Sequence, residues 1–172
     1  MEIQVKPRFR ILTLGLFLAL AACSKAPVDD KPASIARGDA CSLDGMTLAD
    51  FPGPKGQIVW ADGQHDFFCD TREIIATLLK PEQQRAMKGA YVQDMAKTDW
   101  DKPQDAWIDA KAAFYVQGSK RHGSMGPTLA SFAERGAADA FAQQYGGKVV
   151  AYAEIKPDAV SMDGGMDHDQ KM

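Results

Sequence analysis

Two sulfur-bearing side chains lie five residues apart in the segment Cys41-Ser-Leu-Asp-Gly-Met46. This segment has few helix or strand signals, so burial in a core gives little reason for a thiol and a thioether there. Thiolate and thioether are the ligands that monovalent copper prefers, because a soft ion binds sulfur better than carboxylate or water. We therefore predict that Cys41 and Met46 are metal ligands and that the ion is Cu(I).

Five residues supply only two sulfur ligands, so a third has to come from elsewhere in the chain. Met125 stands between glycines in His122-Gly-Ser-Met-Gly126, whereas packing methionines normally sit on a helix or strand stripe. Met125 is the predicted third ligand; the alternative is that it fills a gap in the core. His122 and His65 are further candidates for a nitrogen ligand, although a single histidine is more often a surface or hydrogen-bonded residue.

The amino-terminal region has the three parts of a secretory signal. Basic residues precede an uncharged apolar run, residues 11–22, which is too short to span a bilayer comfortably. The run ends in Leu20-Ala-Ala-Cys23, the pattern of a bacterial lipoprotein signal. We predict cleavage before Cys23 and lipidation of its thiol, which attaches the domain to a membrane surface. An uncleaved anchor with an incidental cysteine is the alternative.

Export places the two remaining cysteines, Cys41 and Cys69, in an oxidising compartment where cysteines usually pair. Cys69 can be a buried thiol or a disulfide partner of Cys41, with metal ligation ranked behind both. Zinc would require four ligands from cysteine and histidine at a spacing that this sequence does not supply.

Charge and motifs exclude several classes of protein. Removal of residues 1–22 changes the formal net charge from −3 to −5, so the chain is not predicted to bind nucleic acid. None of the three histidines falls in a Gly-x-Ser-x-Gly or His-Glu-x-x-His arrangement, and the carboxylates are spread along the chain. We therefore expect a binding protein and not an enzyme.

The residue pattern in the first half of the folded region predicts a ββαβ unit. Short strands are expected at 57–61 and 65–68 around the hairpin dipeptide Asp62-Gly63. Asp70, with Glu73 three residues on, predicts the start of an apolar-faced helix that ends at Lys80-Pro81. A further helical turn at 82–89 and a closing strand at 90–95 complete the unit.

The second half predicts the same order of elements. Strands are expected at 112–117 and 127–132 on either side of a long loop at 118–126. A helix follows at 133–145, stops at Gly146-Gly147, and leads to a closing strand at 148–155. The predicted fold is α+β, built from two small tandem ββαβ units with Trp100 and Trp107 covering their seam.

The predicted division of the chain has five parts. These are a signal peptide (1–22), a lipidated flexible tether (23–38), the metal motif with the first unit (39–97), a connector with the second unit (98–157) and a disordered tail (158–172). Each unit is too small for a robust core of its own, so the two are expected to pack together.

The combined motifs resemble the NosL family of nitrous oxide reductase accessory lipoproteins. The resemblance rests on the lipoprotein signal, on Cys41-Ser-Leu-Asp-Gly-Met46 beside the family's Cys-x-x-(Cys or Asp)-Gly-Met pattern, on Met125-Gly126, and on Ala140-Phe-Ala with Gly146-Gly-Lys-Val-Val. It spans most of the mature chain. Asp44 stands where some members have a second cysteine, so a Cys-x-x-Cys function is not available here.

The resemblance implies a periplasmic copper chaperone. Such a protein holds Cu(I), through Cys41, Met46 and Met125 with a histidine as a candidate fourth ligand. It passes the ion through the NosDFY complex toward the copper-sulfide centre of nitrous oxide reductase. The resemblance also implies a fold like the noncatalytic region of organomercurial lyase. We expect a lipid anchor on the periplasmic side of a bacterial membrane, with the outer membrane preferred, and a monomer or a copper-bridged dimer.

Two alternatives from other classes stay open. One is a binding lipoprotein stapled by a disulfide between Cys41 and Cys69, with no role for metal. The other is a metal–thiol enzyme like organomercurial lyase, which would need paired cysteines and an acid in one pocket; the spacing of the cysteines does not suggest such a pair.

Overall fold

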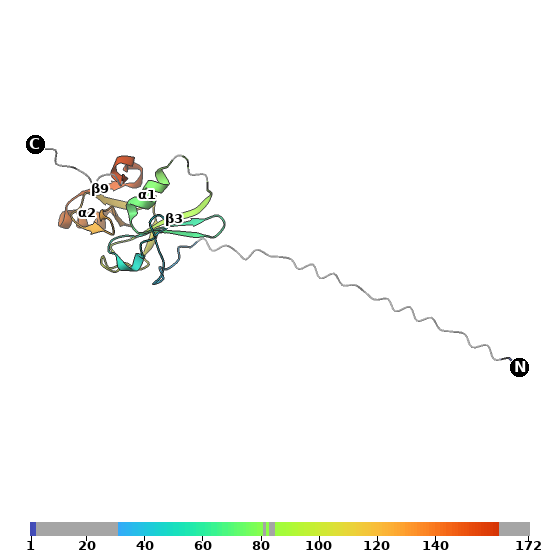
Figure 1. Ribbon diagram of the computed structural model, residues 1–172. Coiled ribbons are helices and arrows are strands. Elements are labelled where there is room, and N and C mark those ends of the chain that lie inside the picture. The colour runs from blue at the N-terminus through green and yellow to red at the C-terminus, as the bar shows by residue number, and fades with distance from the viewer. Residues whose placement is uncertain (3–30, 81, 83–84, 162–172) are drawn as a thin grey trace, which may run out of the picture.

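The computed structural model describes residues 1–2, 31–80, 82 and 85–161, and its elements form antiparallel sheets with two α-helices (Figure 1). The fold is α+β, as predicted. Along the chain the elements are η1 (Leu48–Asp50), β1 (Gly56–Trp60), β2 (His65–Phe68), α1 (Thr71–Leu79), β3 (Met87–Gln93), β4 (Trp107–Asp109), β5 (Phe114–Gln117), β6 (His122–Gly123), β7 (Gly126–Pro127), β8 (Ala130–Phe132), α2 (Arg135–Tyr145), β9 (Lys148–Ala151), η2 (Tyr152–Glu154) and η3 (Pro157–Val160), where η denotes a 3-10 helix.

The first sheet has the strand order β2-β1-β3-β4. Strand β1 is buried along its whole length because it pairs with β2 on one side and with β3 on the other. Helix α1 begins where Asp70 accepts a hydrogen bond from the backbone N–H of Arg72, as the capping pattern predicts. Ile74 and Ile75 are fully buried, and Ile74 packs so closely on Gly56 that a Cβ atom there would lie 2.5 Å from its Cγ2.

The second sheet has the strand order β8-β5-β9, with helix α2 packed against all three strands. In both sheets the first strand of the unit is central and lies between the second strand and the strand that follows the helix. Trp100 stacks on Phe141 of α2 at 5.3 Å between ring centroids, so this tryptophan packs on the second unit. The small hairpin of β6 and β7 is inserted between β5 and β8.

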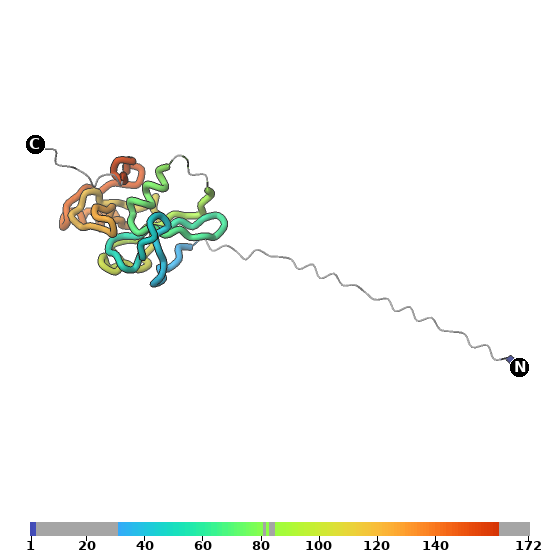
Figure 2. The backbone as a smooth tube through the Cα atoms, in the orientation of Figure 1, coloured from blue at the N-terminus to red at the C-terminus, as the bar shows by residue number. Residues whose placement is uncertain are grey.

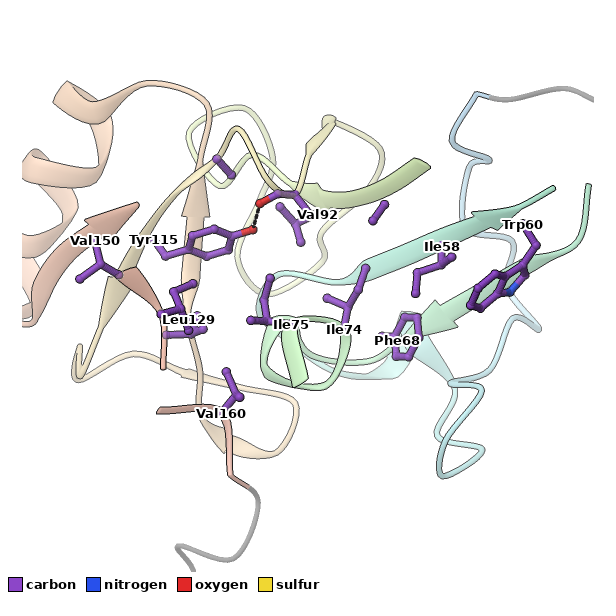
Figure 3. Close-up of a cluster of buried hydrophobic side chains, with 14 residues drawn as sticks. Ile58, Trp60, Phe68, Ile74, Ile75, Val92, Tyr115, Leu129, Val150 and Val160 are labelled. Atoms are coloured by element: carbon purple, nitrogen blue, oxygen red, sulfur yellow. Dashed lines mark hydrogen bonds between the residues drawn. The ribbon is translucent and has the colours of Figure 1, made fainter. Parts of the chain in front are cut away.

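A single cluster of buried apolar residues joins the two halves of the fold. Figure 3 shows Ile58, Phe68 and Ile74 from the first half beside Tyr115, Leu129 and Val150 from the second. The Tyr115 hydroxyl donates a 2.5 Å hydrogen bond to the carbonyl oxygen of Ala110. Because the apolar core is shared, the two halves pack together as expected for units of this size.

Four details of the predicted secondary structure are wrong. The closing strand expected at 148–155 ends at Ala151, because residues 152–154 form η2. Residues 87–89 belong to strand β3 and not to a helical turn, because β3 pairs with β1 as far as Met87. The strand expected at 127–132 is divided into β7 and β8, with Leu129 buried between them. The predicted tail begins too early, since Val160 in η3 is buried against the core. The rest of that tail, residues 162–172, lies outside the described residues.

The predicted signal peptide and lipid anchor lie outside the described residues, apart from residues 1–2. Cys23 and the apolar run before it are among the residues that are not described. In the part of the chain that is described, no helix has the length and apolar character needed to cross a bilayer. The end of the predicted tether contacts the domain, because the backbone N–H and C=O of Ala33 both bond to the side-chain amide of Gln57, at 3.0 and 2.9 Å.

Candidate metal centre

The segment from Cys41 to Met46 closes into a tight loop. The backbone N–H of Cys41 donates to the carbonyl of Met46 at 2.9 Å, and the N–H of Gly45 donates to the carbonyl of Cys41 at 2.9 Å. Gly45 has φ of 77°, a conformation that glycine adopts without steric cost. The Asp44 carboxylate accepts from the N–H of Met46 at 2.9 Å, which fixes the turn. The loop is therefore preformed by local hydrogen bonds.

One backbone hydrogen bond docks this loop beside the end of β2. The N–H of Ser42 donates to the carbonyl of Phe67 at 2.8 Å. Leu48, just after the loop, is 1% exposed and secures the segment to the domain. Figure 2 shows the loop, in blue, folded against the body formed by the later elements. Cys41 is thereby placed next to Cys69, which follows β2 directly.

Four side chains that can bind metal converge at this point: Cys41, Asp44, Cys69 and Glu73. One ligand atom from each lies within 4.8 Å of the others. Both thiols and Glu73 are buried, whereas Asp44 is exposed at the rim. The sulfur of Met46 is 4.0 Å from the Sγ atom of Cys69, so a thioether borders the same cluster.

Glu73 is the centre of the hydrogen bonds within the cluster. Its Oε2 atom accepts from the Cys41 thiol at 3.2 Å, from the Cys69 thiol at 3.3 Å and from the backbone N–H of Cys69 at 3.1 Å. A carboxylate oxygen that accepts hydrogen bonds from both protonated thiols holds the two sulfur atoms close to one another. The site is therefore organised before any ion arrives.

The two thiols differ in acidity. The pKa of Cys41 is lowered from its usual value because its thiolate accepts a hydrogen bond from the Cys69 thiol, whose single proton then points to the Cys41 sulfur and not to Glu73. The pKa of Cys69 is raised, because Cys69 is the proton donor in that pair, is buried, and faces the negative charge of Glu73. Cys41 is thus the thiol that ionises first and the readier ligand.

The remaining predicted sulfur ligand lies on the β6–β7 turn. Met125 is 41% exposed, and its neighbour Ser124 donates a 2.7 Å hydrogen bond from Oγ to the carbonyl of Cys69. The turn is therefore attached to the backbone of a cluster residue. The role of the Met125 sulfur as a ligand stays a prediction.

The two candidate histidines lie outside the four-residue cluster. His65 Nδ1 is 3.0 Å from Oε1 of Gln57, and the backbone carbonyl of His122 accepts from the indole N–H of Trp100 at 3.1 Å. The His65 ring therefore makes the kind of contact that is usual for an isolated histidine, whereas the bond of His122 involves only its backbone. Their role as ligands also stays a prediction.

Cys41 and Cys69 are both free thiols, so the disulfide expected as one reading of Cys69 is absent from this structure. The interpretation that their spacing does not suggest a pair was also wrong. The Ser42–Phe67 hydrogen bond brings the two thiols together across the fold, a proximity that sequence spacing does not reveal.

Sequence reasoning also missed the carboxylates of the cluster. Glu73 was read only as a partner of Asp70 in the capping pattern, and Asp44 only as a replacement for cysteine. The available signal was the capping pattern itself, because a Glu in the first turn of α1 reaches back to the residues before the helix, and Cys69 is one of them. Glu73 is 3% exposed, and an acidic side chain is rarely buried to this extent unless it has hydrogen-bond or charge partners.

The NosL family model matches residues 32–160, which include the whole cluster. The chain belongs to the NosL family. The copper-binding lipoprotein NosL of Stutzerimonas stutzeri is 42% identical over 167 residues, which is 92% of this chain and 87% of that protein. The copper-binding lipoprotein NosL of Achromobacter cycloclastes is 38% identical over 163 residues, covering 88% and 82%.

A solved NosL structure shares this fold. The crystal structure of the copper chaperone NosL from Shewanella denitrificans superposes with a TM-score of 0.69 at 38% identity, covering 74% of this chain and 97% of that one. The resemblance to the NosL family drawn from the motifs is confirmed. These relatives are named for binding and carrying copper and not for an enzymatic reaction, in agreement with the expectation of a binding protein.

Proposed function

We propose that this protein is a periplasmic, membrane-anchored metallochaperone that binds Cu(I) and delivers it for assembly of the copper-sulfide centre of nitrous oxide reductase. One observation carries the proposal: the free thiols of Cys41 and Cys69 meet in one cluster, with the Met46 sulfur 4.0 Å from Cys69. Thiolate and thioether sulfur suit a soft monovalent ion. NosL relatives named copper-binding lipoprotein support the choice of copper.

The mixed exposure of the site suits transfer as well as binding. Cys41 and Cys69 are buried, whereas Asp44 of the same cluster is exposed, as is Met125 on the β6–β7 turn, which is attached to Cys69 through Ser124. An exposed rim lets a partner's ligand approach the ion before the buried thiolates release it. Of the proposed ligands, the exposed Met125 is the one that a partner's ligand can replace, whereas a site whose four protein ligands are all buried would resist such an exchange. We propose Cys41, Met46 and Met125 as Cu(I) ligands, as predicted, and add Cys69.

The direct test measures Cu(I) affinity by competition with a chromophoric Cu(I) chelator under anaerobic conditions. We expect one Cu(I) per chain, and a loss of affinity of at least tenfold for Cys41→Ser and for Cys69→Ser, since each removes a thiolate. Met46→Leu and Met125→Leu keep the side-chain volume and remove only the thioether, so weaker losses are expected.

Met87→Leu is the matched control for the thioether variants. Met87 packs against the apolar core from strand β3, so its replacement should leave Cu(I) affinity unchanged. If Cys41→Ser and Cys69→Ser both bind Cu(I) as tightly as the wild type, the cluster is not the copper site.

Zinc is the ion that competes with copper for this cluster. The sequence was judged unable to supply four zinc ligands from cysteine and histidine, but the structure gathers two cysteines and two carboxylates. Zinc accepts this combination of sulfur and oxygen ligands. Titration of the apo protein with Zn²⁺ in the presence and absence of one equivalent of Cu(I) separates the two ions. Displacement of Cu(I) by stoichiometric Zn²⁺ would argue against copper as the cargo.

Delivery to nitrous oxide reductase, directly or through the NosDFY complex, is the finer part of the proposal. It is supported by the family to which the chain belongs. Cells lacking the gene should recover nitrous oxide reduction when supplied with the wild-type gene but not with the Cys41→Ser gene. Equal recovery with both genes would show that copper binding at Cys41 is not needed for nitrous oxide reduction, which would contradict the proposed delivery.

The anchor and the assembly state complete the proposal. Lipidation of Cys23 would hold the domain on the periplasmic side of the membrane, with the outer membrane as the proposed location. Metabolic labelling with a fatty-acid analogue, followed by membrane separation, tests both, with Cys23→Ser as the control that should lose the label. Sedimentation of the apo and copper-loaded protein then distinguishes a monomer from a copper-bridged dimer.

A further inference from the structure

A buried lysine and a serine connect the β6–β7 turn to the metal cluster. Lys55 is 0% exposed, and its Nζ atom donates to the hydroxyl of Ser124 at 2.6 Å and to the carbonyl of Pro52 at 2.8 Å. The hydroxyl of Ser124 in turn donates to the carbonyl of Cys69 at 2.7 Å. A hydroxyl can accept from one partner while it donates to another, so the chain from lysine to serine to cysteine is continuous.

Burial of an ammonium group is costly, so Lys55 requires an explanation. Burial lowers its pKa to about 8, while the nearby acidic groups Asp70, Cys69, Glu73 and Cys41 oppose that shift. The cation is therefore retained near neutral pH within the field of the cluster. Its two hydrogen bonds hold one loop residue and one residue of the β6–β7 turn together. A charge-assisted bond of this kind is stronger than one between neutral groups.

A second set of contacts ties the far side of the same hairpin to the same segment of chain. The hydroxyl of Thr128 donates to Oδ1 of Asp70 at 2.8 Å, and Nη1 of Arg72 donates to the carbonyl of Pro127 at 3.1 Å. The hairpin is thus fixed to residues 69–72 at its turn and at its end. Met125 lies between these attachments and is 41% exposed.

This inference rests on the proposed function and concerns how the Met125 sulfur is presented. We propose that Lys55 and Ser124 are positioning residues, which hold the β6–β7 turn on the Cys69 carbonyl so that the Met125 sulfur is presented to the Cu(I) bound by the two thiols. Neither residue binds the ion. The exposed thioether is then the ligand that a copper-accepting partner reaches first.

The test compares Ser124→Ala with Ser119→Ala. Ser119 is a buried serine of the same region, and its hydroxyl bonds to the carbonyl of Arg121 at 3.3 Å, not to the cluster. We expect Ser124→Ala to weaken Cu(I) binding by about three- to fivefold and by no more than Met125→Leu does, because it acts only through that thioether, and Ser119→Ala to leave it unchanged. Lys55→Met, which removes the donor to Ser124 and keeps an unbranched side chain, should cause a loss of similar size.

A double-mutant cycle with Met125→Leu separates positioning from a general loss of structure. Once the thioether is gone, Ser124→Ala should have no further effect on Cu(I) affinity, because the turn no longer carries a ligand. X-ray absorption at the copper edge should count one sulfur neighbour fewer in Ser124→Ala and in Met125→Leu than in the wild type. Far-ultraviolet circular dichroism and unfolding midpoints establish that each variant is folded.

Three outcomes overturn the inference. Equal losses from Ser124→Ala in the wild-type and Met125→Leu backgrounds would show a merely structural role. If Ser124→Ala and Lys55→Met both bind Cu(I) like the wild type while Cys41→Ser abolishes binding, these two residues do not position Met125. The proposed copper site then stands without this inference. If Cys41→Ser also binds Cu(I) normally, the proposed function fails and the inference fails with it.

Discussion

The Oε2 atom of Glu73 lies 3.2 Å from the Sγ atom of Cys41. The same oxygen is 3.3 Å from the Sγ atom of Cys69, so one buried carboxylate receives hydrogen bonds from both thiols. In the metal-free protein these bonds keep the thiols in place. A metal ion that binds the sulfurs has to displace their protons, which couples loading to pH.

The thiols of the metal-free protein should ionise in two separate steps. The pKa of Cys41 is lowered from 9.0 by the hydrogen bond from Cys69, whereas that of Cys69 is raised. Thiolate absorbance at 240 nm should therefore rise by about half of its full amplitude below pH 9, and the second half should appear only at much higher pH. A single step of full amplitude near pH 9 would contradict this pairing.

Replacement of Glu73 by glutamine should lower the pKa of Cys69. The negative charge of Glu73 is one cause of the raised value, and glutamine removes the charge while it keeps the shape. We expect the second thiolate step to move to lower pH, with little change in the first. Glu134→Gln, at the start of α2 and without a side-chain cap bond, is the control that should leave both steps in place.

Cu(I) affinity should rise with pH. Below the pKa values of both thiols, each cysteine loses one proton when it binds Cu(I). Affinity should therefore increase about 100-fold per pH unit when two thiols bind. The variant Cys69→Ser retains one thiol and should show about a tenfold increase per unit. Competition titrations between pH 5.5 and 7 measure both slopes. Affinity that does not vary with pH would mean that no thiol is deprotonated on binding.

A side chain at Gly123 should destabilise the protein. A Cβ atom there would collide with the Asp70 carboxylate and would lie 2.9 Å from Cβ of Thr128, where the hairpin meets the cluster. We expect Gly123→Ala to cost about 1 to 3 kcal/mol in unfolding free energy. Gly136→Ala is the matched control, since nothing lies within 4 Å of a Cβ atom at that helical position, and it should be neutral or stabilising by up to about 1 kcal/mol. Urea denaturation of the two variants beside the wild type provides the comparison.

Asp70 should make a contribution to stability that falls as pH rises. Burial raises its pKa from 3.8 to about 6, so the folded state holds the proton more tightly than the unfolded state between these values. The stabilisation from that proton is complete below 3.8 and is lost as pH rises through 6, a change of about 2 to 3 kcal/mol.

The asparagine variant isolates this term because its side chain does not titrate. The stability of the wild type relative to Asp70→Asn should therefore be greatest near pH 4 and smallest near pH 7, measured by urea denaturation of the metal-free proteins. A difference that stays constant over this range would exclude the raised pKa.

The local features of the site were predictable from the chain. The capping pattern at Asp70 placed the start of α1 correctly, and hydrogen bonds within residues 41–46 close the loop that carries Cys41 and Met46. Such features depend on neighbours a few residues apart, which sequence patterns record directly. The split of residues 127–132 into two strands was not predictable, because it follows from contacts of Leu129 with the shared core.

By itself the sequence determined that a thiol and a thioether stand five residues apart at Cys41 and Met46, and it predicted the α+β class of the fold. Only the tertiary structure decided that Cys69 and Glu73 belong to the same site as Cys41, which lies 32 positions before Glu73. That meeting depends on the docking of the loop on β2, on the pairing of β1 with β2 and on the packing of α1. Proximity between distant segments arises from sheet register and core packing, and local residue spacing carries no record of either.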